Sequence, residues 1–149
     1  MILADTNFWL ALSLSEHAFH STARDWFAAQ SLAASVLFAR ATQQSLLRLL
    51  TTEATTRPYG IPPMTNAGAW RLFEGLLADE RIAWVAEPAG IEARWKGLAA
   101  RATASPKLWM DAYLAAFAVA GGHRLVTTDK AFKQFDGLNA IVLAATHTG

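Results

Sequence analysis

Short apolar stretches alternate with longer amphipathic ones along the whole chain. Five stretches are brief enough, and rich enough in aliphatic residues, to be buried strands. Segments with apolar residues at helical spacing lie between them and predict helices. This alternation favours a parallel α/β sheet covered by helices on both faces. The predicted strands are 1–4, 35–38, 82–85, 124–128 and 140–143, and the predicted helices are 7–14, 18–30, 40–52, 66–79, 91–101 and 107–120.

The last predicted helix has the clearest boundary signals. Ser105-Pro106 precedes it, a residue able to cap followed by a proline suited to the first turn, and Gly121-Gly122 follows it. The proline-rich segment 57–63 predicts a loop. Because the chain shows no repeat or composition break, we expect one domain over residues 1–149.

The composition excludes several kinds of functional site but says little more about the fold. The 149 residues are 53% hydrophobic and 17% charged, which excludes a disordered chain. There is no Cys, so disulfide frameworks, thiolate zinc sites and cysteine nucleophiles are excluded. The formal net charge is +1, so a nucleic-acid partner would need a local basic patch. Neither a signal peptide nor a membrane-length apolar run is evident, and we expect a cytoplasmic protein without a membrane contact.

Aspartates follow two of the predicted strands. Asp5 comes directly after strand 1–4, and Asp129 directly after strand 124–128. Ligands of open parallel sheets bind at the carboxyl ends of the strands. If these two strands are neighbours, their spacing of about 4.8 Å brings both carboxylates to one edge. Each aspartate is equally suited to cap the helix that follows it.

A third aspartate, Asp111, lies inside a predicted helix on a stripe with Leu108 and Ala115. Burying its charge without a partner would cost several kcal/mol. It therefore needs a cation opposite, either an arginine such as Arg40 or Arg48 or a metal ion. Three converging carboxylates, with no Cys available, suit Mg²⁺ or Mn²⁺ better than zinc. Such an ion can activate water and stabilise the charge on a phosphate being cleaved.

Together these motifs resemble the PIN-domain ribonucleases, and within them the VapC toxins of bacterial type II toxin-antitoxin pairs. The resemblance rests on segments 1–7, 41–51, 105–116 and 125–132, which agree in order and spacing. It implies a three-layer α/β/α PIN-like fold with a central parallel five-stranded sheet, and hydrolysis of RNA phosphodiester bonds. By position, it implies that Asp5, Asp111 and Asp129 hold Mg²⁺ or Mn²⁺, with Asn7, Thr127 and Thr128 as polar support.

One position departs from the commonest family pattern. Gln43 stands where PIN domains usually place a Glu in the third helix, and its helical line with Leu46 and Leu47 predicts that it points inward. Glu53 lies about 15 Å further along the helix axis and cannot replace it. An amide keeps an oxygen acceptor but lacks the charge. We therefore include Gln43 among the catalytic residues and expect one firmly held metal, with a second recruited mainly with substrate.

The resemblance also implies partners. They are an RNA substrate, a cognate VapB-type antitoxin and a second copy of the chain in a homodimer. An RNA with an exposed loop is a sensible target because its bases can be splayed out. The resemblance to VapC toxins implies that this RNA is often transfer RNA. Candidate phosphate contacts are the basic residues near the motifs, although each is equally suited to an ordinary surface: Arg40, Lys107, Lys130 and Lys133.

Some aromatic and histidine residues need a separate interpretation. Most of the six Trp residues are expected in the core, but Trp9 and Trp26 are candidate interface anchors, because the resemblance places an antitoxin groove over the first two helices. His17 and His20 lack a third ligand, so we assign them no metal site.

Two other α/β folds with acidic residues at strand ends, and one other function, are alternatives for this sequence. A response-regulator receiver and a haloacid-dehalogenase phosphatase would each need a further acidic residue near Asp5, where Thr6 and Asn7 stand. The stronger alternative is a catalytically weak PIN module that binds RNA or antitoxin without cleavage, with Gln43 marking the loss. The presence of all three aspartates argues against it, since an acidic pocket does not favour a polyanion.

Overall fold

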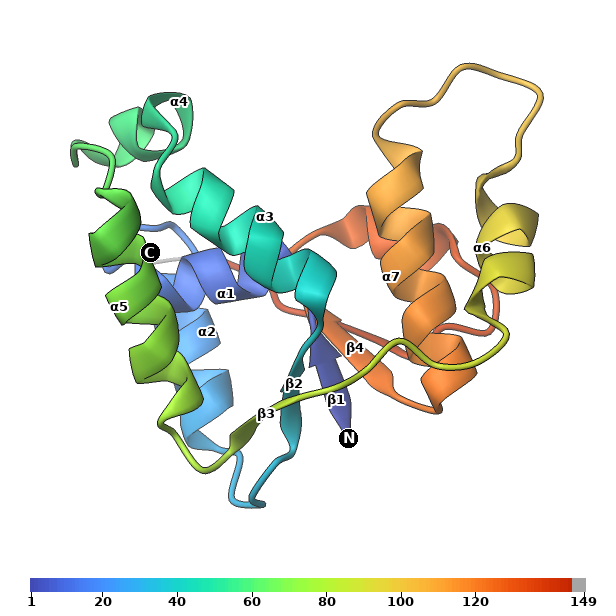
Figure 1. Ribbon diagram of the computed structural model, residues 1–149, viewed down its shortest axis with the longest axis horizontal. Coiled ribbons are helices and arrows are strands. Elements are labelled where there is room, and N and C mark those ends of the chain that lie inside the picture. The colour runs from blue at the N-terminus through green and yellow to red at the C-terminus, as the bar shows by residue number, and fades with distance from the viewer. Residues whose placement is uncertain (146–149) are drawn as a thin grey trace.

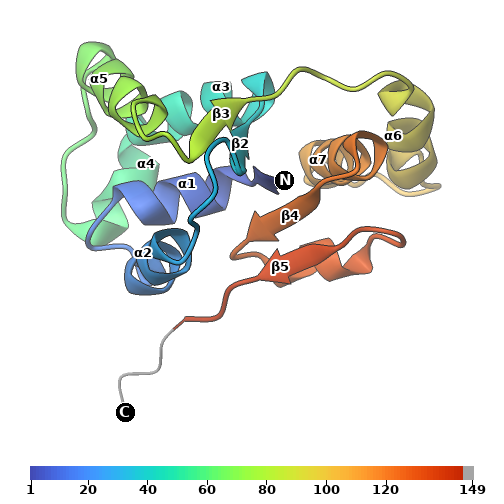
Figure 2. The ribbon, with the colours of Figure 1, turned by 90° about the horizontal axis from the view of Figure 1, so that it is seen from below.

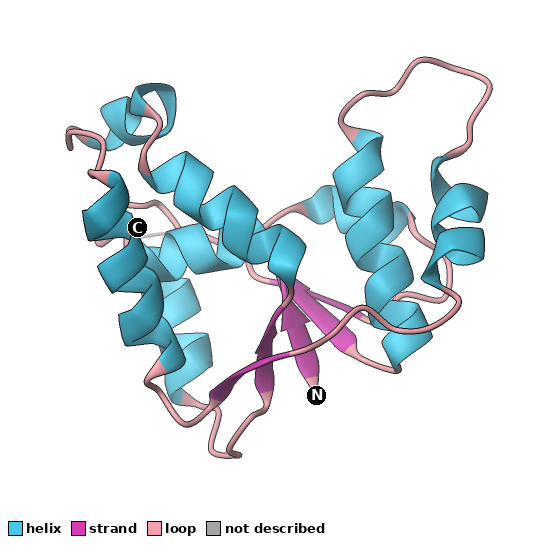
Figure 3. Cartoon of the chain, in the orientation of Figure 1, coloured by secondary structure: helices cyan, strands magenta, loops and turns pink. Residues whose placement is uncertain are grey.

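The five predicted strands form one all-parallel sheet at the centre of the molecule (Figure 1, Figure 3). The computed structural model describes residues 1–145. The spatial order of the strands is β3-β2-β1-β4-β5. Their bounds are Ile2–Ala4 for β1, Val36–Phe38 for β2, Ile82–Trp84 for β3, Arg124–Thr127 for β4 and Ala140–Val142 for β5.

Two groups of helices enclose the sheet, which confirms the predicted three-layer α/β/α arrangement (Figure 2). One group contains α1 (Thr6–Ser13), α2 (His20–Ala28), α3 (Arg40–Leu50), α4 (Glu53–Thr56) and α5 (Asn66–Leu77), and the other contains α6 (Ile91–Ala99) and α7 (Leu108–Gly121). The short helices η1 (Arg57–Tyr59) and η2 (Lys130–Gln134) complete the set. None of the helices within residues 1–145 has the length and apolar character to cross a membrane.

Successive residues of each strand contribute their side chains alternately to the two faces of the sheet, and so to two halves of the core. Ile2 and Ala4 pack against the layer that contains α1 and α3, whereas Leu3 packs against α7 on the other face. Side chains of successive strand residues point to opposite faces, so a strand buried on both sides must be apolar throughout. This is why these short stretches are recognisable in the sequence.

The segment after α3 differs from the prediction. We expected the helix to run to residue 52 and a loop at 57–63, but α3 ends at Leu50 and the chain continues as α4 and η1. The loop prediction is confirmed for residues 60–63, which lie in the irregular segment between η1 and α5. The hydroxyl of Thr52 donates to the carbonyl of Arg48 at 2.6 Å. Side-chain bonds of this kind compete with the regular helix and favour a change of direction.

The predicted start of α7 was also wrong in detail. Lys107 occupies the N-cap position, and the Ser105 side chain makes no capping bond; its backbone carbonyl accepts from the Leu108 N–H at 3.0 Å. The predicted stop is confirmed, because Gly122 ends α7 with a φ of 67°, a left-handed conformation that favours glycine. The single domain over residues 1–149 stays a prediction, since residues 146–149 lie outside the described part.

The sheet register determines where the site lies. β1 is flanked by β2 and β4, with Ala4 opposite Val126. The N–H of Asp5 donates to the carbonyl of Val126 at 3.0 Å, continuing this ladder by one residue. Residues that follow β1 and β4 are therefore neighbours at the carboxyl edge of the sheet.

Candidate active site

Asp5 is the innermost acidic residue at the carboxyl edge of the sheet. It is 5% exposed, and its Oδ2 accepts a hydrogen bond of 2.8 Å from the hydroxyl of Thr127. Burial raises the pKa of Asp5 to about 7; the Thr127 hydrogen bond opposes this, and the charges of Asp111 and Asp129 add to it. A buried carboxylate in this condition needs a cation to stay ionised near neutral pH.

Asp129 follows β4 and is half-buried. Its backbone N–H donates to the Thr127 hydroxyl at 3.0 Å, and its Oδ1 accepts from the Ala131 N–H at 2.8 Å. The cap interpretation is thus correct for Asp129, which caps η2, whereas Asp5 occupies the N-cap position of α1 without making a capping bond. Thr127 contacts both aspartates and fixes their relative position.

Asp111 reaches the same region from the first turn of α7 and is half-buried. Burial raises its pKa to about 6, with a further contribution from the charge of Asp129. The predicted alternative, an ion pair with Arg40 or Arg48, is wrong, because the ion pairs among residues 1–145 involve neither arginine and none of the three aspartates. The three carboxylates therefore repel one another without a compensating protein cation.

The donor set fits a hard divalent cation, since it consists of carboxylate oxygens in an anionic, partly buried pocket. The oxygens are not gathered around one point, however: within the described residues, no three His, Asp or Glu side chains are arranged to hold a metal ion.

Gln43 points inward as predicted and is 3% exposed. Its Oε1 accepts a hydrogen bond of 2.5 Å from Nη1 of Arg40. The guanidinium carbon of Arg40 also lies 4.5 Å from the centre of the Trp84 ring. The amide oxygen is thus already engaged, which weakens Gln43 as a metal ligand.

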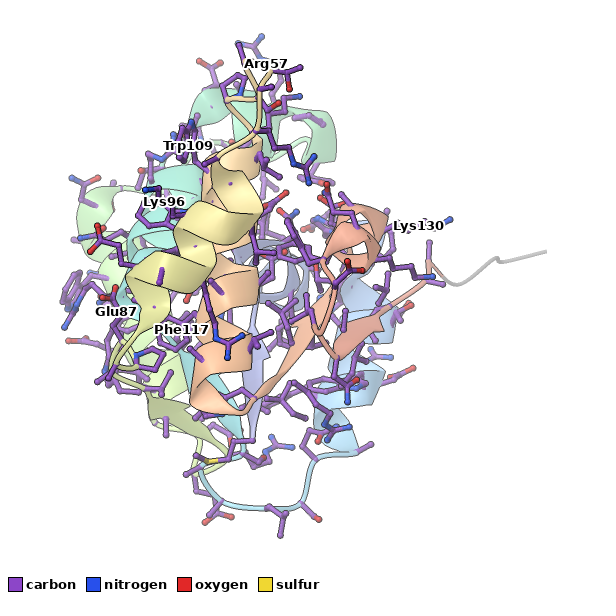
Figure 4. All side chains as sticks on the ribbon, turned by 90° about the vertical axis from the view of Figure 1, so that its right-hand side faces the viewer. Arg57, Glu87, Lys96, Trp109, Phe117 and Lys130 are labelled. Atoms are coloured by element: carbon purple, nitrogen blue, oxygen red, sulfur yellow. The ribbon has the colours of Figure 1, made fainter. Side chains whose placement is uncertain are left out.

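A cavity of about 520 Å³ adjoins the acidic residues. Its lining includes Asp111 and Asp129 together with Lys107 and Gln134. Lys130 is exposed on the neighbouring η2 (Figure 4). Two of the predicted phosphate contacts, Lys107 and Lys130, therefore lie at or beside the acidic edge. Lys133 is exposed on the same short helix.

The other two residues predicted as polar support make fewer contacts than Thr127. Asn7 is exposed and Thr128 is half-buried, and neither makes a side-chain hydrogen bond to another described residue. Glu53 lies in α4, where it forms an ion pair of 3.0 Å with Arg57. It takes no part in the acidic cluster, as the helix geometry predicted.

The histidines near α2 serve packing. His17 accepts a hydrogen bond from the Phe19 N–H at 3.1 Å and stacks on Tyr59 with ring centres 5.0 Å apart. Nδ1 of His20 lies 2.9 Å from the carbonyl of Ala11. Neither ring belongs to a metal-binding group within residues 1–145.

The predicted interface role of Trp9 was wrong. Trp9 is fully buried and stacks on Phe38 with ring centres 3.8 Å apart, so it cannot contact a partner. Trp26 is half-buried against Phe8. The exposed indoles are elsewhere, at Trp70, Trp84 and Trp109.

Sequence reasoning missed a second group of functional candidates at the same edge of the sheet. Trp84 ends β3, and Glu87 follows three residues later and accepts a hydrogen bond from the hydroxyl of Tyr113. The signal was present, because residues that follow a strand of a parallel sheet lie at its ligand-binding edge. A Glu that follows a strand by three residues is a weaker signal than Asp5 or Asp129, which follow their strands directly.

Comparison with known proteins identifies the class. Residues 2–138 match the PIN domain family. The chain is 51% identical over 145 residues to Ribonuclease VapC41 from two strains of Mycobacterium tuberculosis, CDC 1551 / Oshkosh and ATCC 25618 / H37Rv, covering 97% of this chain and 99% of each relative. The chain therefore belongs to the PIN-domain family and, within it, to the VapC proteins.

Solved structures share the fold. VapC20 of Mycobacterium tuberculosis, a toxin that cleaves the sarcin-ricin loop, aligns with a TM-score of 0.66 at 18% identity, over 93% of this chain and 98% of that one. The VapBC2 structure from Rickettsia felis, bound to a DNA fragment from the promoter, aligns with a TM-score of 0.63 at 13% identity, over 96% and 99%. These similarities confirm the PIN fold.

Proposed function

We propose that this protein is a metal-dependent endoribonuclease and the toxin of a type II toxin-antitoxin pair, with Asp5, Asp111 and Asp129 as the carboxylates that hold Mg²⁺ or Mn²⁺. One observation carries the assignment of residues. Three aspartates from separate parts of the chain lie at the carboxyl edge of the sheet, where burial, with a further contribution from the neighbouring aspartates, raises the pKa values of Asp5 and Asp111; none of the three is paired to a protein cation among the described residues. The 51% identity to a VapC ribonuclease supports the activity.

The residues of the chain have distinct tasks in this proposal. Thr127 orients Asp5 through its hydroxyl and holds the Asp129 backbone, so the two carboxylates keep a fixed spacing. A bound divalent ion would supply a water of lowered pKa and charge stabilisation at the phosphate. Lys107, Lys130 and Arg40 would draw the RNA backbone to an edge that is otherwise anionic.

The metal stoichiometry follows from Gln43. Its side chain carries no charge, and its oxygen is bound to Arg40. We therefore propose one firmly held metal, with a second recruited mainly with the RNA. We keep Gln43 in the proposed catalytic region because it is buried near the start of α3, which follows β2, the strand that pairs with β1.

The proposed partners are an RNA with an exposed loop, a VapB-type antitoxin and a second copy of the chain. Solved structures that share the fold include toxin-antitoxin assemblies from Rickettsia felis and Klebsiella pneumoniae, which supports an antitoxin partner. VapC20, which shares the fold, is a toxin that cleaves the sarcin-ricin loop, and we propose an RNA with an exposed loop, such as transfer RNA, as the substrate of this chain. A cytoplasmic location is part of the same proposal.

The test is cleavage of total RNA by the purified, antitoxin-free protein in the presence of Mg²⁺ or Mn²⁺, beside the Asp5→Asn variant. We expect discrete fragments from the unmodified protein and none from the variant. Equal loss of RNA in both samples would mean contamination by another nuclease. No cleavage in either, with RNA binding retained, would favour the non-cleaving PIN module.

A further inference from the structure

A second cavity, of about 340 Å³, lies between the carboxyl ends of β2 and β3 and the middle of α7. Glu87 and Phe117 lie on one flank of α7, and Lys130 lies on the opposite flank beside the first cavity (Figure 4). The lining residues that matter here are Arg40, Trp84, Glu87, Tyr113 and Phe117. The proposed active site uses only Arg40 among them.

One wall of this cavity is a planar stacking surface. Trp84 is 40% exposed, and its inner side packs against Phe38 and Phe73, with ring centres 6.2 Å and 5.6 Å away. The Arg40 guanidinium lies over the ring at 4.5 Å. Aromatic rings and guanidinium planes are the surfaces on which unpaired RNA bases stack.

The opposite wall presents a fixed hydrogen-bonding group. The Tyr113 hydroxyl donates to Oε2 of Glu87 at 2.6 Å, and Trp95 and Phe117 pack edge-on against the Tyr113 ring. Burial raises the pKa of Tyr113 above its usual value, and the Glu87 hydrogen bond and charge add to this, so the phenol stays a donor. Glu87 forms no ion pair with a described Lys or Arg. It offers remaining lone pairs to N–H donors, and its charge disfavours a phosphate.

Arg40 connects this cavity to the proposed active site. The same side chain that covers Trp84 donates to Gln43 at 2.5 Å. A base in the cavity would therefore belong to a nucleotide close to the phosphate at the acidic edge. In this arrangement the acidic edge would bind the RNA phosphate backbone, and the second cavity would bind a base of the same strand.

We propose that the cavity binds one unstacked RNA base that presents two adjacent N–H donors, as the Watson–Crick edge of guanine does, between the Arg40–Trp84 pair and Tyr113, with Glu87 as the acceptor. This proposal rests on RNA being the substrate and adds a base preference that the acidic residues cannot supply. A peptide of the antitoxin is the competing occupant, and the negative charge of Glu87 together with the planar wall favours the base.

The test measures RNA binding separately from cleavage. In the Asp5→Asn background, fluorescence anisotropy would compare heptauridine with the same heptamer carrying one central guanosine. We expect the guanosine heptamer to bind more tightly, and Trp84→Ala to weaken its binding by about tenfold or more. Trp70→Ala is the matched control, because Trp70 is 49% exposed on α5, outside both cavities, and should change binding less than about twofold.

Glu87→Gln provides a second variant that replaces an exposed side chain and should fold normally. We expect it to abolish the preference for guanosine while binding of heptauridine is maintained or increased. Equal binding by the Trp84 and Trp70 variants, or an unchanged guanosine preference in Glu87→Gln, would overturn the proposal. So would a Trp84→Ala variant that weakens antitoxin binding and leaves RNA binding intact. Failure of the unmodified protein to cleave RNA, with base-selective binding present, would refute the nuclease assignment alone.

Discussion

The hydroxyl of Thr127 donates a hydrogen bond of 2.8 Å to the carboxylate of Asp5, joining residues that are far apart in the sequence and adjacent in the sheet. This bond lowers the pKa of Asp5 and opposes the effect of burial. Thr127, at the end of β4, therefore favours the ionised form of Asp5.

Replacing Thr127 by Val should therefore raise the pKa of Asp5 further and weaken metal binding. A hydrogen bond to a charged group contributes about 1.5–3 kcal/mol, which corresponds to about tenfold or more in the Mn²⁺ dissociation constant. Calorimetric titration of the RNA-free protein measures it. Thr127→Ser retains the hydroxyl and should bind Mn²⁺ nearly as well as the unmodified protein; equal loss in both variants would contradict this role.

The metal-free protein should lose stability as the pH rises. The pKa of Asp5 is about 7 in the folded chain and 3.8 as an ordinary side chain, so its stabilising contribution is full below about pH 4 and is lost as the pH rises through about 7. The loss is on the order of 2 to 4 kcal/mol.

Thermal unfolding of the unmodified protein and Asp5→Asn at pH 4 and pH 8, with EDTA, tests this pH dependence. The variant should be the more stable of the two at pH 8, and the difference should shrink at pH 4. Added Mn²⁺ should stabilise the unmodified protein at pH 8 and have little effect on the variant. A variant that is less stable than the unmodified protein at pH 8 would show that burial does not penalise this carboxylate.

Gln43→Glu should strengthen a second metal site. The substitution adds a negative charge at the position where the family usually has a Glu, although Arg40 would compete for it. We expect calorimetry without RNA to show one Mn²⁺ bound firmly to the unmodified protein and a second bound more tightly in the variant than in a Gln43→Ala control. Two tight sites in the unmodified protein would refute this assignment.

Lys107 and Lys130 should contribute to RNA binding through phosphates. Each substitution by Ala should lower the salt dependence of binding, reducing the slope of log K against log salt concentration by about 0.7 for a single-stranded RNA. The measurement uses Asp5→Asn protein, so that the RNA is not cut. Lys96 on α6 is a control, since it lines neither cavity, and its substitution by Ala should leave the slope unchanged (Figure 4).

Phe38→Ala should lower the stability of the fold beneath the site, because Phe38 is a core residue and not a proposed catalytic one. Phe38 is fully buried, stacks on Trp9 and lies beneath Trp84. Removing a buried Phe typically costs about 3–5 kcal/mol. Denaturant unfolding should show this loss, and Leu32→Ala, at a site that is 72% exposed, should change stability by less than about 0.5 kcal/mol.

The sequence by itself determined the layered parallel architecture, since strands buried on two faces must be apolar throughout and Leu3 and Ala4 are both fully buried, one on each face. It also placed Asp5 and Asp129 directly after strands, and predicted that Gln43 points inward. These features depend on residues close together in the chain, because their spacing determines which face of a strand or helix, or which edge of the sheet, a side chain occupies.

Tertiary structure alone decided which side chains meet. The Thr127–Asp5 bond, the contact of Arg40 with Trp84 and the stacking of Trp9 on Phe38 each join segments that meet only in the folded protein. The apolar pattern of the sequence does not distinguish a Trp in the core from a Trp that lines a cavity. Likewise, an aspartate directly after a strand can be either a helix cap or a metal ligand. Only the packing of distant elements distinguishes them, because burial and the proximity of other charges depend on neighbours that the local sequence does not specify.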